Sequence, residues 1–256
     1  MLIKAKSLNG YKLNGIDGEV GNVKEVYFDD KFWTVRYLVV STGNWLTGKK
    51  VLISPYFIQS IDYESELVDI DLTKQQVYDS PSWDDEKPVS RQYEEQYSSY
   101  YGTPAYWYGT NIWGTYPYIV RDRTKWQENK NIESPWQSNL RSSKEVDGYN
   151  FQATDGEIGH VEDFIINDDT WTIRYVVLDT KNWLPGKKIL ISTQWIDRIS
   201  WEDSKVYVDL ARETIKNVPE YDEDEVITRE YESRLHQHYN REGYWLREPA
   251  FSDYSH

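Results

Sequence analysis

The sequence predicts a mainly β protein built from two small closed barrels, with accessory helices. Three observations support this fold class. The chain repeats itself at an offset of about 138 residues, each repeat contains short runs of alternating polar and apolar residues, and turn-forming dipeptides separate these runs. Several short strands in fewer than about 80 residues favour a closed barrel, because closure removes the exposed edges at which sheets aggregate.

The duplication extends through most of each half of the chain. Roughly 31 of about 76 positions are identical between residues 6–81 and 144–219, without a gap. Two copies are too few for a solenoid, which stacks three or more units. We therefore distinguish a first and a second repeat. Three blocks of corresponding residues define them: Asp17–Gly21 with Asp155–Gly159, Trp33–Tyr37 with Trp171–Tyr175, and Asn44–Ser54 with Asn182–Ser192.

Each repeat has the period of β-strands. In the first repeat, Trp33, Val35, Tyr37 and Val39 occupy every second position of one segment, which is the period of a β-strand. The Asp17-Gly18 dipeptide is typical of a tight turn. We expect further strands near 50–54, 58–63 and 67–71, and their equivalents near 188–192, 196–201 and 206–209.

A helix is expected after each barrel, because large side chains recur there at three- and four-residue steps. The stripes are Tyr93, Tyr97, Tyr100 and Tyr101 in the first repeat, and Tyr231, Leu235, His238 and Tyr239 in the second. We expect both helices to pack on a barrel or on each other, with rings around Trp107 and Trp113 completing that layer. The predicted organisation is a first barrel over 1–83, a helix over 84–101, an aromatic-rich linker over 102–143, a second barrel over 144–221, and a helix with a C-terminal tail over 222–256.

Composition narrows the class of function. The 256 residues carry a net charge of −14 with a pI near 4.8, which argues against binding nucleic acid or an anionic membrane surface. The sequence contains no cysteine, so disulfides, thiolate nucleophiles and iron–sulfur clusters are excluded. No apolar stretch reaches about 18 residues, so we expect no membrane insertion and a cytoplasmic location.

The repeated motifs resemble those of the PRC-barrel domain family. They are Asp-Gly-Glu-x-Gly-x-Val, then Trp-x-x-Arg-Tyr-x-Val, then Trp-Leu-x-Gly-Lys-Lys-x-Leu-Ile-Ser, and the resemblance covers residues 6–81 and 144–219. It implies two six-stranded PRC-type β-barrels, a module used mainly for protein docking, and it implies no catalytic residues. Two such copies favour an arrangement related by pseudo-two-fold symmetry, as in a homodimer, and they are compatible with a homo-oligomer.

No catalytic, cofactor-binding or metal-binding residue is predicted. Gly18 and Gly156 are not followed by the helix and Lys-Ser/Thr of a phosphate loop. His236 and His238 are two residues apart, which places them on different faces of a helix. Ser54 matches Ser192, yet no histidine stands at a corresponding position in both repeats.

The sequence therefore predicts a non-enzymatic docking or scaffold protein with an unidentified protein partner. Two alternatives stay open: a small-ligand binder or hydrolase that uses a cleft between the barrels, and a weak single-stranded nucleic-acid binder that uses the aromatic linker. The candidate interaction surface combines residues that match between the two repeats with residues of the linker. The matching residues are Trp45, Lys49 and Lys50 with Trp183, Lys187 and Lys188, and the linker residues are Trp107, Trp113, Arg121 and Arg123.

Overall fold

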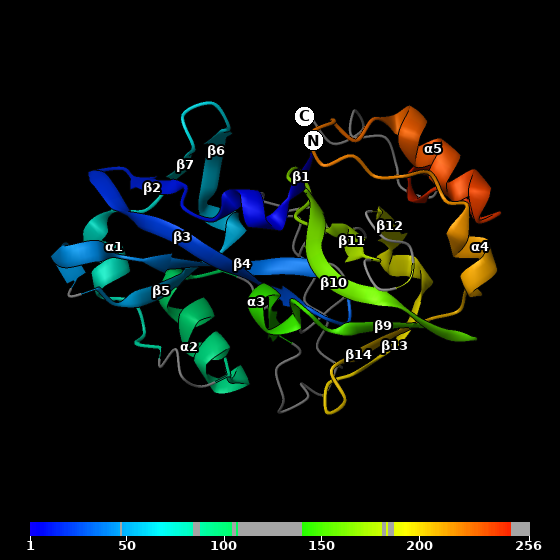
Figure 1. Cartoon of the computed structure of the whole chain (residues 1–256). Helices are drawn as coiled ribbons and strands as arrows, with labels where there is room; N and C mark the ends of the chain where they lie inside the picture. The colour runs from blue at the N-terminus through cyan, green and yellow to red at the C-terminus, as the bar shows by residue number, and fades with distance from the viewer. Residues whose placement is uncertain are drawn as a thin grey trace. The chain divides into compact units, whose positions relative to one another are not determined.

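A computed structural model describes residues 1–46, 48–83, 88–103, 106, 140–180, 183 and 187–246 (Figure 1). Within these ranges the protein is mainly β, as predicted, and its strands form two sheets of seven strands each. No helix in the described ranges is long and apolar enough to cross a membrane.

The first sheet follows the order β5-β4-β3-β2-β7-β6, and β8 pairs with β3 outside this path. Neighbours are antiparallel except β2 and β7, which run parallel. Residues 54–57 alone connect β5 to β6, the two ends of the path. The strands span Lys12–Gly15 (β2), Gly18–Asp29 (β3), Thr34–Ser41 (β4), Lys50–Ile53 (β5), Ile58–Asp62 (β6), Leu67–Ile70 (β7) and Leu140–Ser142 (β8).

The second sheet repeats this topology as β12-β11-β10-β9-β14-β13, with β1 paired to β10 outside the path. Only residues 193–195 connect β12 to β13. The strands span Leu2–Lys4 (β1), Asn150–Ala153 (β9), Gly156–Asn167 (β10), Ile173–Asp179 (β11), Lys188–Ser192 (β12), Ile196–Ser200 (β13) and Lys205–Val208 (β14). Corresponding strands such as β3 and β10 begin 138 residues apart, which confirms the duplication at the level of structure.

The first strand of each repeat joins the sheet of the other repeat. Strand β8 opens the second repeat but pairs antiparallel with β3, so that Tyr27 faces Ser142 and Asp29 faces Leu140. Strand β1 opens the first repeat but pairs with β10. Because β1 and β8 occupy equivalent positions in the repeat, the two repeats exchange the same element.

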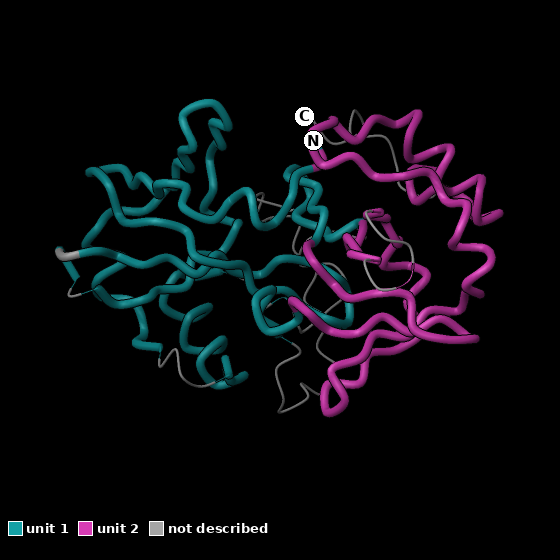
Figure 2. Tube along the Cα trace, in the orientation of Figure 1, with its two compact units in different colours: residues 1, 3–146, 164–174 teal, residues 2, 147–163, 175–256 magenta. Residues whose placement is uncertain are grey.

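The chain divides into two compact units (Figure 2). The first contains Met1, residues 3–146 and residues 164–174; the second contains Leu2 and residues 147–163 and 175–256. The first unit thus holds the first sheet, helix α2 and the β10–β11 hairpin tip of the second repeat, so its limits differ from a simple division between repeats.

Within the first unit, the β10–β11 hairpin tip pairs reciprocally with the equivalent tip of the first repeat. The amide of Val35 donates to the carbonyl of Trp171 at 2.8 Å, and the amide of Ile173 donates to the carbonyl of Trp33 at 2.7 Å. Trp33 and Trp171 both have positive φ angles, 51° and 59°, an unfavourable conformation for a bulky residue. The same local geometry therefore occurs on both sides of a self-complementary contact.

This contact predicts a specific disulfide. Thr34 and Thr172 form an antiparallel bridge whose hydrogen bonds come from their neighbours, and such pairs place Cα atoms about 4.5 Å apart, within disulfide range. We expect the variant T34C/T172C to oxidise within one chain, which a mobility shift on a non-reducing gel detects. The control S41C/T172C moves one cysteine roughly 23 Å along β4 and should stay reduced. A T34C/T172C protein that stays reduced under the same oxidant would contradict the pairing.

The predicted helices form after each sheet. Helix α2 spans Arg91–Tyr101 and α5 spans Arg229–His238; Ser90 and Thr228 cap their first turns through their side chains. The acidic run Asp222–Glu225 lies in a turn ahead of α5 rather than in its first turn. The shorter helices are α1 (Lys74–Tyr78), α3 (Ser143–Val146) and α4 (Arg212–Lys216), with 3₁₀ helices η1 (Ala5–Leu8), η2 (Gly43–Leu46), η3 (Pro55–Phe57), η6 (Thr193–Trp195) and η7 (Tyr244–Leu246).

Packing of the tyrosine stripe onto the first sheet is confirmed. The Tyr97 ring is almost fully buried, lies 5.1 Å from Tyr37 of β4, and its hydroxyl accepts from the Ser54 amide at 3.0 Å. Tyr101 packs on Phe57 at 4.9 Å, whereas Tyr100 is exposed.

In the second unit, α5 packs in a similar way. Leu235 is fully buried, and the ring of Tyr239 lies 4.7 Å from Trp195 of η6. The part of the prediction that concerns Trp107 and Trp113 lies outside the described residues. Tyr106, which precedes Trp107, and its equivalent Tyr244 are both buried.

Candidate functional site

Two tryptophans of the candidate interaction surface occupy equivalent, half-buried positions. The indole of Trp45 donates to the Val20 carbonyl at 2.6 Å, and the Lys74 ammonium lies 5.6 Å from its ring centre. Trp183 has Arg212 in the same place, 5.0 Å from its ring centre. Each ring is thus covered by a cation from the following short helix, which is a stabilising contact within the repeat.

The paired lysines differ between the repeats. Lys49 and Lys50 are exposed, whereas Lys187 and Lys188 are half-buried. The Lys188 ammonium donates to Glu162 at 2.6 Å and also to Glu223. Partial burial alone lowers the pKa of an ammonium, but these two carboxylates raise the pKa of Lys188 above its ordinary value. Lys188 therefore forms an ion-pair cluster within the second unit.

The remaining candidates, Trp107, Trp113, Arg121 and Arg123, lie outside the described residues. The structure therefore brings Trp45 near Lys74 and Lys188 near two glutamates, but it does not gather the candidate surface residues into one described site.

A buried glutamate lies under the helix of the first unit. The Glu94 side chain is fully buried, pairs with Arg91 at 3.0 Å, and accepts from the hydroxyl of Tyr106. Arg36, on β4, stacks 4.1 Å from the Tyr106 ring and lies 3.6 Å from Asp29. Burial, and then the nearby Glu94 carboxylate, raise the pKa of Tyr106, so its hydroxyl stays a donor.

The second unit contains the equivalent cluster. Glu232 of α5 is buried, pairs with Arg229 at 2.8 Å, and accepts from Tyr244 at 2.9 Å and Tyr175 at 2.8 Å. A new member appears here: His236, buried on the same helix, stands where the first repeat has Ser98. Because each carboxylate is enclosed by its own partners, both clusters stabilise the helix-to-sheet contact and neither is open to a substrate.

The sequence contains a pattern that predicts these clusters, although hydrophobic periodicity does not detect it. Arg91 and Glu94 recur as Arg229 and Glu232 with the same three-residue spacing, and a tyrosine follows each glutamate by 12 residues. Matching charged residues between repeats is the comparison that identifies them.

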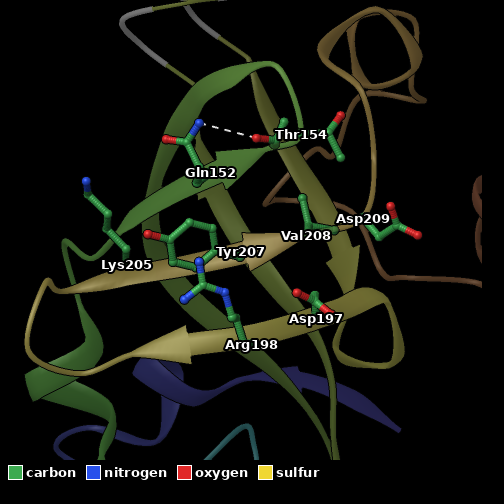
Figure 3. A pocket seen from close by; sticks show the side chains of 9 residues that line it. Gln152, Thr154, Asp197, Arg198, Lys205, Tyr207, Val208 and Asp209 are labelled. Atoms are coloured by element: carbon green, nitrogen blue, oxygen red, sulfur yellow. Dashed lines mark hydrogen bonds between the residues drawn. The ribbon is translucent and has the colours of Figure 1, made fainter.

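An open polar hollow of about 560 Å³ lies on the second sheet (Figure 3). One row of side chains crosses three strands, since Gln152 of β9 neighbours Tyr207 of β14, which in turn neighbours Arg198 of β13. The Arg198 guanidinium stacks 3.8 Å from the centre of the Tyr207 ring. Lys205, Asp197, Thr154 and Asp209 also line the hollow. We call this surface the β13–β14 face.

On the equivalent face of the first repeat, polar side chains are hydrogen-bonded to one another. Asp69 replaces Tyr207, and its carboxylate accepts from Asn14 at 3.1 Å and from Ser60 at 2.9 Å. Ser60 and Leu67 stand where the second repeat has Arg198 and Lys205. The cationic and aromatic chemistry of the β13–β14 face is therefore specific to the second repeat.

Neither face resembles a metal centre. Among the described residues, no group of three or more histidine and acidic side chains is arranged to hold a metal ion.

A comparison with protein-family models matches both repeats to the same family. Residues 2–77 and 151–215 each match the family model described as the PRC-barrel domain, and together they cover more than half of the chain. No curated protein matches the sequence.

Proposed function

The chain belongs to the PRC-barrel domain family, and from this membership we propose that it is a non-enzymatic docking protein whose second domain binds a protein partner. The observation that carries the proposal is the β13–β14 face, which differs from its equivalent in the first repeat in the residues that reach solvent. The two repeats share their core but differ in the chemistry of this face, which supports a recognition role for it in the second repeat.

The chemistry of this face fits a carboxylate-bearing segment of a partner protein. Arg198 and Lys205 supply two cations beside Asp197 and Asp209 on a protein with a net charge of −14. The Arg198 side chain is exposed, and its guanidinium stacks on the Tyr207 ring. A guanidinium edge binds a carboxylate through two parallel hydrogen bonds. Gln152 and Thr154 add neutral hydrogen-bonding groups beside it.

We further propose that both six-stranded paths close into barrels. Strands β5 and β6 stand at the two ends of their path, yet four residues join them. Four linking residues make five Cα–Cα steps, which span at most about 18 Å, whereas the ends of a flat six-stranded sheet lie roughly 24 Å apart. The sheet must therefore curl until its ends approach, and the same reasoning applies to β12 and β13. The reciprocal pairing of Trp33–Val35 with Trp171–Ile173 supports pseudo-two-fold symmetry between the repeats.

Affinity capture with charge-reversed variants tests the docking face. The full chain and its variant R198E/K205E serve as baits in lysate of the source organism, and bound proteins are quantified by mass spectrometry. We expect the variant to lose a partner that the unmodified chain enriches, since disrupting one member of a buried guanidinium–carboxylate pair in an interface costs about 2–5 kcal/mol.

The control variant is R234E/K216E, which makes the same charge change on exposed side chains of α5 and α4. It should retain the partner. Equal recovery with both variants would place the binding surface elsewhere, and recovery of no partner by the unmodified chain would count against docking altogether.

The hollow also favours a second candidate, a small-ligand binder, because its volume lies within the usual range for ligand pockets. Isothermal titration with short dicarboxylates would separate a small anion from a protein segment. The nucleic-acid alternative depends on linker residues such as Trp107 and Arg121, which lie outside the described residues, and stays a prediction.

A further inference from the structure

The outward side of β14 carries a cation at one end and a carboxylate at the other. Lys205, Tyr207 and Asp209 follow one another at two-residue steps, and side chains two residues apart on a strand share a face. The intervening Val206 and Val208 are buried, so the other three side chains point away from the core. Four steps of extended chain therefore separate the lysine from the aspartate, which is about 13 Å.

Strand β13 has the same order of charges because it contains a β-bulge. Its Ile196 and Arg198 pair with consecutive residues of β14, so Asp197 is the extra residue of the bulge. Asp197 and Arg198 are both exposed although they are consecutive, and Asp197 lies on the side of Asp209. Figure 3 shows the two cations toward one end of the hollow and the two carboxylates toward the other.

The charges on this face are not used for ion pairs within the second unit. Among the described residues, none of Arg198, Lys205, Asp197 and Asp209 takes part in a salt bridge. A purely acidic segment would meet two carboxylates beside the two cations, and like charges that face each other across an interface weaken binding. A segment with one charge of each sign, in the opposite order, pairs both ends of the face.

We propose that the β13–β14 face binds an extended, bipolar peptide segment of a partner protein. An acidic side chain of this segment pairs with Arg198 and Lys205, and a basic side chain about four residues away pairs with Asp197 and Asp209. The inference rests on the docking function proposed above and adds the charge pattern of the partner.

The length of the face favours a peptide over a small zwitterion. A single amino acid spans only about 3.3–3.6 Å, which is too short to reach from Lys205 to Asp209, whereas four steps of extended chain cover this distance. The equivalent face of the first repeat has neither cation, and Gln59 occupies the position of Asp197. We therefore expect one such peptide to bind per chain.

NMR titration of the full ¹⁵N-labelled chain with three end-blocked peptides tests the charge pattern. The bipolar probe is Gly-Thr-Glu-Thr-Ser-Thr-Lys-Thr-Gly, and the acidic probe replaces its lysine by glutamine. The short probe, Gly-Thr-Thr-Glu-Ser-Lys-Thr-Thr-Gly, has the composition of the bipolar probe with its charges only two residues apart. We expect the bipolar probe to bind at least about threefold more tightly than either of the others, which is the size of a surface ion pair.

The variant D197N/D209N gives changes of opposite sign for the two kinds of segment. It should weaken binding of the bipolar probe about threefold, because the lysine of the probe loses its partners. It should strengthen binding of the acidic probe, because two repelling carboxylates are removed. The control E213Q/E225Q makes the same change of charge on exposed side chains away from the hollow and should alter neither affinity.

The outcomes separate this inference from the docking function. If R198E/K205E loses the bipolar probe while D197N/D209N binds it as tightly as the unmodified chain, the bipolar pattern is overturned and docking of a carboxylate stands. Undiminished binding of the probe by R198E/K205E would count against both. If the unmodified chain binds none of the probes, the bipolar inference is overturned, and the capture experiment above decides the docking function separately.

Discussion

Replacing Glu94 by alanine should lower the free energy of unfolding by about 3–5 kcal/mol, because it leaves the buried Arg91 guanidinium without its carboxylate. The change also removes the acceptor of the Tyr106 hydroxyl. Chemical denaturation monitored by tryptophan fluorescence measures the loss.

The neighbouring Glu95 provides a matched control, since it has the same side chain on the same helix but is exposed. Its alanine variant should change stability by less than about 0.5 kcal/mol. Equal losses for the two variants would show that the buried pair does not hold α2 to the sheet.

Replacing Tyr97 by alanine should cost about 3–5 kcal/mol, the usual range for truncating a fully buried aromatic ring. The ring contacts Tyr37, and its hydroxyl accepts from the Ser54 amide. Thermal unfolding of the variant measures this contribution.

The variant Y97F separates the two contributions. It keeps the ring and removes the acceptor of the Ser54 amide, so it should cost about 1–3 kcal/mol. Tyr100 is exposed on the same helix, and Y100A should cost less than Y97A. A Y97A protein as stable as the unmodified chain would mean that the tyrosine stripe is not part of the core and is available to a partner.

The secondary structure could be predicted from the sequence because residues close together in the chain determine it. Alternation around Val35 and Tyr37 predicted β4, and the spacing of Tyr93, Tyr97 and Tyr101 predicted both helix α2 and its buried side. Comparing the repeats then extended each prediction to a second position.

The features that sequence reasoning missed depend on contacts between distant residues. Nothing in the segment Leu140–Ser142 indicates that it pairs with β3 rather than with its own repeat. Glu94 and His236 are polar residues on a helix, for which exposure is the ordinary expectation. Their burial follows from residues that pack around them, which include Arg91 and Tyr106 at Glu94 and two tryptophans at His236. The β13–β14 face follows from strand register, which brings Gln152, Tyr207 and Arg198 into one row.

The measurement that tests the docking proposal most directly is the recovery of a partner by R198E/K205E relative to the unmodified chain at physiological salt. The proposal predicts at least about a tenfold loss, while R234E/K216E stays at the unmodified level and all three proteins unfold at similar temperatures. Equal recovery by R198E/K205E and the unmodified chain would contradict the assignment of the β13–β14 face as the binding surface.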